Sequence, residues 1–235
     1  QRKRVLKHLK ALALGPTASC VASSKGTGHR LVHHRTRDDG AVVDKDGKRA
    51  GGKLGGRSIQ YFKVDDESDP SKATDNVNKL IKRDRVDVLV GTIHSGVAMT
   101  MARVARDTNT LMIVPNAGAA ELTGSMCAPN VFRTSFSNWQ PGYASGLLAA
   151  RKRKTAVTIS WKYAAGDESV RGFREGFEKG GGRVIKDLNL PFPNVEFQAL
   201  LTEIAATKPD AVFTFFAGGG AVKFVKDYAA SGLKK

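Results

Sequence analysis

The chain has 235 residues, 41% of them hydrophobic, which is enough for a substantial core in one large domain or two smaller lobes. Its formal net charge is +16, and no apolar run approaches the roughly 18 residues that a membrane-spanning helix requires. The sequence therefore predicts a chain without a membrane span. A strongly basic chain also raises the question of a nucleic-acid partner.

The positive charge is concentrated at the N-terminus. Residues 1–57 contain 14 Lys and Arg against 4 Asp and Glu, whereas the remaining residues contain 24 against 18. This basic segment has no helix-turn-helix pattern, no aromatic residues for base stacking, and no Cys and His at zinc-finger spacing. We therefore expect no nucleic-acid partner and no metal site.

Residues 1–24 have the outline of a secretory signal peptide. A basic stretch is followed by an uncharged run that Pro16 interrupts and that ends in small residues around Cys20. This pattern indicates an exported, periplasmic protein with a decayed export signal, and cleavage before Cys20 would give a lipoprotein anchor. Residues 25–50 show neither helical nor strand periodicity, so we expect residues 1–50 to be poorly ordered and to contribute no strand.

The next segment contains a strand–helix–strand unit. Residues 58–64 predict a strand, residues 65–70 an acidic loop, and residues 71–83 a helix. Residues 86–90 and 111–114 are short apolar runs typical of buried parallel strands. Between them, Val97, Met101, Val104 and Ala105 recur at helical spacing behind Ser95, which stands where an N-cap belongs.

Two turns of this unit meet at the carboxyl ends of its strands, residues 91–96 and 115–118. Both are rich in small residues, and the first opens a helix, whose N-terminus favours an anion. We therefore expect Ser95 and neighbouring amides to hold a carboxylate or phosphate. The alternative is that Ser95 only caps its helix.

The second half repeats the alternation of strands and helices. A helix is expected from about residue 140 and strands at 155–161, 184–190 and 211–216. Further helices are expected at 168–179, 197–207 and 221–231, with residues 218–220 as a glycine turn. Alternating strands and helices predict an α/β fold with doubly wound parallel sheets.

This order of segments resembles the type I periplasmic binding proteins of ABC transporters, in the branch that binds branched-chain amino acids. The resemblance runs from about residue 51 to residue 233. It rests on the stretches GGKLGGRSIQYFKVDDESDP, VNKLIKRDRVDVLVG, HSGVA, PNAGA, NVFRTSFSNWQP, WKYAAGDESVRGFREGFEKGGG, LPFPNVEFQALLTEI and KPDAVFTFFAGGGAVKFVKDYAASGL. The wording of WKYAAG and FFAGGGA is most similar to members that import aromatic or other small organic acids.

The resemblance implies a two-lobed, non-catalytic binding protein. Lobe 1 would span residues 51–135 and lobe 2 residues 136–235, both incomplete in this chain, with a small carboxylate ligand in the cleft between the lobes. Permease subunits of an ABC importer would be the protein partner, and no cofactor is implied. The positions that match the family's ligand contacts are Ser95, Gly96, Asn116, Ala117, Gly118, Trp161, Tyr163, Ala165, Gly166, Ala217 and Gly218.

Other functions fit the sequence less well. A dinucleotide-dependent enzyme needs a GxGxxG turn between a strand and a helix, and a serine hydrolase needs a Gly-x-Ser-x-Gly elbow; the chain has neither. The alternative within the same fold is the ligand-sensing domain of a receptor or transcriptional regulator. For a repressor, residues 1–57 would have to supply a DNA-binding head, which they do not resemble.

Overall fold

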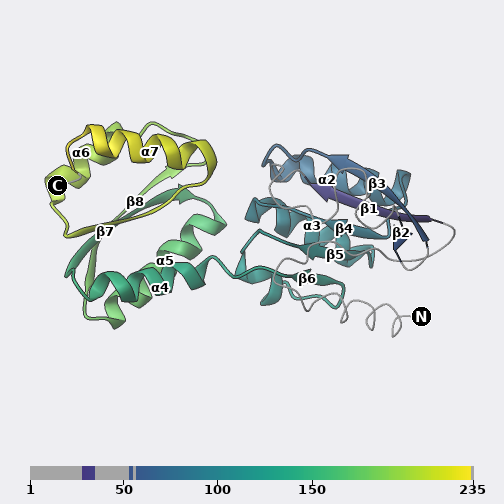
Figure 1. The fold of residues 1–235 in the computed structure, drawn as a ribbon, viewed down its shortest axis with the longest axis horizontal. Helices are drawn as coiled ribbons and strands as arrows, with labels where there is room; N and C mark the ends of the chain where they lie inside the picture. The colour runs from purple at the N-terminus through teal and green to yellow at the C-terminus, as the bar shows by residue number, and fades with distance from the viewer. Residues whose placement is uncertain (1–27, 35–52, 55–56, 234–235) are drawn as a thin grey trace. The chain divides into compact units, whose positions relative to one another are not determined.

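The structure is a computed structural model that describes residues 28–34, 53–54 and 57–233. The chain divides into two compact units, Gln1–Phe136 and Ser137–Lys235. Each unit contains a sheet built mainly of parallel strands with helices packed against it (Figure 1). The predicted signal segment and the remainder of residues 1–50, apart from 28–34, lie outside the described residues.

Unit 1 contains a six-stranded sheet of order β2-β3-β1-β4-β5-β6. Only β2 pairs antiparallel; the other pairings are parallel. The strands are β1 Gly28–His34, β2 Lys53–Leu54, β3 Arg57–Val64, β4 Val88–Val90, β5 Leu111–Val114 and β6 Val131–Arg133. The helices are α2 Pro70–Asn78, a π-helical turn η2 Lys79–Arg83, α3 Ser95–Asp107 and a 3-10 turn η3 Ala120–Thr123.

Strand β1 corrects the expectation that residues 1–50 supply no strand. It lies between β3 and β4, with Val32 opposite Phe62 on one side and Leu89 on the other. The sequence Gly28–His34 contains only Leu31 and Val32 as large apolar residues, so it lacks the continuous run expected of a central parallel strand. Pairing along both edges defines this strand, and local periodicity does not reveal such pairing.

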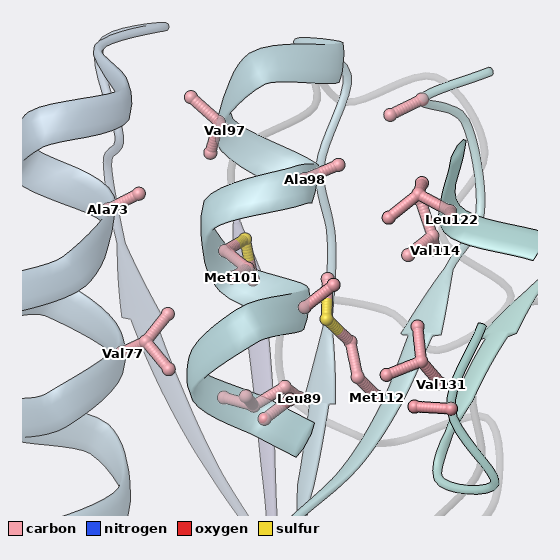
Figure 2. Packing of buried hydrophobic residues seen from close by; sticks show 14 of the residues in the cluster. Ala73, Val77, Leu89, Val97, Ala98, Met101, Met112, Val114, Leu122 and Val131 are labelled. Carbon is pink, nitrogen blue, oxygen red and sulfur yellow. The ribbon is translucent and has the colours of Figure 1, made fainter. Parts of the chain in front are cut away.

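The core of unit 1 lies between the sheet and helices α2 and α3 (Figure 2). Helix α3 contributes Val97, Met101 and Ala105, each with no exposed surface, which confirms the predicted stripe except for half-buried Val104. Leu89 and Met112 from β4 and β5 pack into the same cluster. This packing fixes where α3 begins relative to the strand ends.

Unit 2 is a three-stranded parallel sheet with helices on both faces (Figure 1). Its central strand is β7 Thr155–Lys162, flanked by β8 Arg183–Pro191 and β9 Ala211–Phe215. Its helices are α4 Trp139–Ala150, α5 Ala164–Lys179, α6 Gln198–Thr207 and α7 Gly218–Ala230. One buried cluster includes Phe173 and Phe177 of α5, and another includes Leu201 of α6 and Phe224 of α7.

Two helices of unit 2 begin earlier than predicted. Helix α5 begins at Ala164 instead of residue 168, and α7 begins at Gly218 instead of residue 221. Residues 218–220 are predicted as a turn, but Gly220 lies in the first turn of α7. Gly166 lies likewise in the first turn of α5, and both glycines are in close contact with Trp161. A glycine can therefore mark close packing of a helix start as well as a turn.

Candidate functional site

The carboxyl ends of β3, β4 and β5 lie at one edge of the first sheet because these strands run parallel through β1. Ligands of open α/β sheets bind at such an edge. Three turns follow these strand ends: residues 65–69, 91–94 and 115–119. The backbone N–H of Ala117 donates to the carbonyl of Thr92 at 2.9 Å, so the two turns singled out from the sequence do meet.

Ser95 is the first residue of α3 and is 1% exposed. Its prediction as N-cap is wrong, because His94 occupies the cap position and accepts a hydrogen bond at Nδ1 from the Val97 N–H, 3.3 Å away. Gly96 follows in the same turn, where a side chain would crowd the His94 ring. Ser95 therefore lies among the backbone N–H groups of the helix start, where an anion is favoured.

The turn after β5 is held by hydrogen bonds from side chains at and beyond β6. The Arg133 guanidinium donates to the carbonyl of Ala119 at 2.8 Å, and the Ser135 hydroxyl donates to that of Asn116 at 3.0 Å. Asn116 is exposed, whereas Ala117 and Gly118 are buried. The Asn116 side chain is therefore the accessible one of these three predicted contacts.

Two residues of this edge were not assigned from the sequence. Asp66 belongs to the predicted acidic loop, yet it is only 6% exposed and accepts a hydrogen bond from Thr92 Oγ1 at 2.6 Å. Its position just beyond β3 was the available signal, since strand ends of one sheet share an edge.

His94 lies in this polar group with a shifted acidity. Burial lowers its pKa below the ordinary value of 6.5, and the nearby Asp66 carboxylate partly opposes that effect. A neutral imidazole is what the cap requires, because only an unprotonated Nδ1 can accept from Val97.

In unit 2, the end of β7 carries a buried aromatic cluster. Trp161 is 4% exposed, and its indole N–H donates to the carbonyl of Asn194 at 2.6 Å. Its ring meets Phe192 and Phe216 edge-on, with centroids 5.0 and 5.2 Å away. An added Cβ on Gly220 would lie 2.4 Å from the Trp161 ring, so α7 closes over it.

Tyr163 extends this cluster and is less enclosed. Its ring lies 5.3 Å from that of Phe192 and 6.4 Å from that of Phe215. Burial raises the pKa of Tyr163 to about 12, so the phenol stays neutral at physiological pH. Of the two predicted aromatic contacts, Tyr163 is half-buried whereas Trp161 is buried, and their ring centroids lie 6.5 Å apart in an edge-on arrangement.

The remaining predicted contacts of unit 2 lie at helix starts. Ala165 and Gly166 are buried in the first turn of α5, and a Cβ on Gly166 would lie 2.0 Å from the Trp161 carbonyl. Ala217 is the N-cap residue of α7, and Gly218, exposed with φ of +53°, begins that helix. The start of α7 therefore offers backbone groups at the same edge as Trp161.

The described residues contain no group of three or more His, Cys, Asp or Glu placed to hold a metal ion. Within the same part of the chain, no helix is both long and apolar enough to cross a membrane.

Comparison with known proteins identifies the family. Residues 42–235 match the profile of a family described as "Periplasmic binding protein". The chain belongs to this family. Its two α/β units with parallel sheets are those of the type I fold, of which the chain covers part.

Several solved members resemble the chain. One is an ABC transporter solute-binding protein from R. palustris in complex with benzoate, which is 50% identical with a TM-score of 0.80 and matches 89% of this chain and 60% of its own. Another, from Rhodopseudomonas palustris BisB5 in complex with 3,4-dihydroxybenzoic acid, is 28% identical with a TM-score of 0.77, over 88% of this chain and 59% of its own.

Curated relatives include a Leu/Ile/Val-binding protein homolog from Brucella melitensis. It is 26% identical over 187 residues, which make up 78% of this chain and 47% of the relative. The chain thus spans about half the length of the curated relatives it matches.

Proposed function

We propose that this protein is the solute-binding component of an ABC importer. It would act in the periplasm, without catalysis, by capturing a small carboxylate ligand and delivering it to permease subunits. The observation that carries the proposal is the 50% identity, over 89% of this chain, to a solute-binding protein whose structure contains benzoate.

The geometry of each unit supports an aromatic acid as the ligand. Unit 1 provides Ser95 and Gly96 at the buried start of α3, which suits a carboxylate. Unit 2 provides the half-buried Tyr163 beside the rings of Trp161 and Phe192, which suits an apolar ring. We propose that Asn116, Ala117, Gly118, Ala217 and Gly218 add contacts from the turns at these two edges.

Branched-chain amino acids are the second candidate ligands, because the curated relatives are named Leu/Ile/Val-binding proteins. An amino acid also needs a partner for its ammonium group. The aromatic cluster around Tyr163 and the higher identity to the benzoate-bound protein favour the aromatic acid.

The first prediction concerns Ser95. In calorimetric titrations of the chain with benzoate, Ser95→Ala should raise the dissociation constant about 10- to 100-fold, since a charge-assisted hydrogen bond is worth roughly 1.5–3 kcal/mol. Benzamide, which has the same ring without the charge, should bind weakly to both forms and discriminate little between them.

The competing outcomes are distinct. Tight binding of leucine but not of benzoate would replace the proposed ligand class with amino acids. An unchanged benzoate dissociation constant in Ser95→Ala, with the circular dichroism of the folded protein retained, would leave Ser95 as a packing residue only.

A further inference from the structure

Asp66 is a buried carboxylate with defined partners. Its Oδ2 accepts a hydrogen bond from Thr92 Oγ1 at 2.6 Å, and its Oδ1 accepts from the backbone N–H of Ser68 at 2.8 Å. A carboxylate removed from water requires such partners, and the short distance to Thr92 is typical of a charge-assisted bond. Both carboxylate oxygens of Asp66 therefore already accept hydrogen bonds from groups within unit 1.

Thr92 joins the three turns at the carboxyl edge of the first sheet. It follows β4, its hydroxyl reaches Asp66 beyond β3, and its carbonyl accepts from the Ala117 N–H beyond β5. It is 2% exposed, and the preceding Gly91 N–H donates to the carbonyl of Ile113 at 3.1 Å. The turn that leads into α3 is thus anchored on both sides.

The single hydroxyl hydrogen of Thr92 points to Asp66, so this oxygen can only accept further hydrogen bonds. An ionised ligand carboxylate is also acceptor-only, and neither Thr92 nor Asp66 can bind it. Donors of the kind that suit a carboxylate lie at the start of α3, in its backbone N–H groups and the hydroxyl of Ser95; of these, the Val97 N–H already donates to His94.

We propose that Asp66 is a positioning residue of the ligand site: through Thr92 it fixes the turn before α3 and directs a ligand carboxylate to Ser95. This inference rests on the proposed function and deepens it. Asp66 itself does not contact the ligand. Its role is to set the geometry and the donor–acceptor pattern of the residues that do.

The test compares three variants of the full chain. Thr92→Val removes the hydroxyl at nearly constant shape, and Thr92→Ser restores it. Asp69→Ala is the matched control, because Asp69 lies in the same loop but accepts from the N–H and hydroxyl of Ser71 at 2.8 and 2.7 Å, at the start of α2.

The expected pattern separates positioning from general stability. Thr92→Val should weaken benzoate binding at least about tenfold, whereas Thr92→Ser and Asp69→Ala should stay within about threefold of the parent chain. Asp69→Ala should nevertheless lower the midpoint of thermal unfolding, since it loses a helix cap. Equal weakening in Thr92→Val and Asp69→Ala would overturn the proposal.

A readout without ligand keeps this test independent of the proposed function. Amide hydrogen exchange, followed by NMR, should accelerate at the Ala117 N–H by about tenfold or more in Thr92→Val and not in Asp69→Ala. If the parent chain does not bind benzoate and Ala117 still responds, the proposed function fails and the anchoring role stands. Unchanged exchange at Ala117 would overturn the positioning role, whatever binds.

Discussion

His94 makes the start of α3 sensitive to pH. Burial lowers the pKa of His94 below 6.5, more than the Asp66 carboxylate raises it, so the folded unit binds this proton less readily than the unfolded chain. The contribution of neutral His94 to the unfolding free energy should therefore be fully present above about pH 6.5 and decrease as the pH drops below this ordinary histidine value. Protonation would also remove the acceptor that caps Val97.

His94→Asn should remove this component of the pH dependence, because asparagine caps helices well and does not titrate. We expect the loss of unfolding free energy between pH 7.5 and pH 5 to be smaller in His94→Asn than in the parent chain. Urea denaturation followed by far-ultraviolet circular dichroism measures the difference. An identical loss in both proteins would show that another group is responsible.

The close packing of helices α4 and α5 depends on glycines spaced four residues apart in each helix. Gly142 and Gly146 of α4 face Gly172 and Gly176 of α5 so closely that a Cβ on Gly146 would lie 2.2 Å from the Phe173 carbonyl. Because the clashing atom is backbone, the helices themselves would have to separate. Gly146→Ala should therefore lower the unfolding free energy of unit 2 by about 2 kcal/mol, as overpacking outweighs the roughly 1 kcal/mol gained in helix propensity.

Gly219→Ala is the matched control for this substitution. Gly219 also lies in a helix, α7, but no atom is within 4 Å of its added Cβ, so alanine should be neutral or slightly stabilising there. Tryptophan fluorescence during urea denaturation reports on unit 2, since Trp139 and Trp161 both belong to it. Equal midpoints for the two variants would contradict close packing of α4 and α5.

Features of the fold that neighbouring residues determine could be predicted from the sequence, whereas features that depend on distant segments could not. The spacing of Val97 and Met101 predicts α3, because helical periodicity depends only on neighbouring residues. The rule that parallel strands end at one edge of a sheet predicts that the turns of Ser95 and Ala117 lie close together. The burial of Asp66 and Trp161 could not be predicted from neighbouring residues, because it depends on segments distant in sequence, Thr92 for one and Gly220 for the other. Loop composition alone carries no such information.

At the scale of the whole molecule, β1 determines whether unit 1 holds together. It pairs with both β3 and β4, so its loss would divide the six-stranded sheet into two pieces. Val32→Pro would remove one backbone donor from this central strand, a position where proline is not tolerated. We expect it to lower the unfolding free energy of unit 1 by about 3 kcal/mol or more, taking the cost of proline inside regular structure as the guide.

The location of the tryptophans allows the two units to be followed separately in this experiment. Far-ultraviolet circular dichroism reports on both units, whereas tryptophan fluorescence reports on unit 2 alone. Val32→Pro should therefore lower the urea midpoint seen by circular dichroism and leave the fluorescence transition in place. Lys53→Pro, in the two-residue edge strand β2, should have a much smaller effect because an edge strand tolerates proline. If Val32→Pro and Lys53→Pro have the same urea midpoint by circular dichroism, β1 does not support the sheet. The ordered part of lobe 1 would then begin near Gly51, as the sequence predicts.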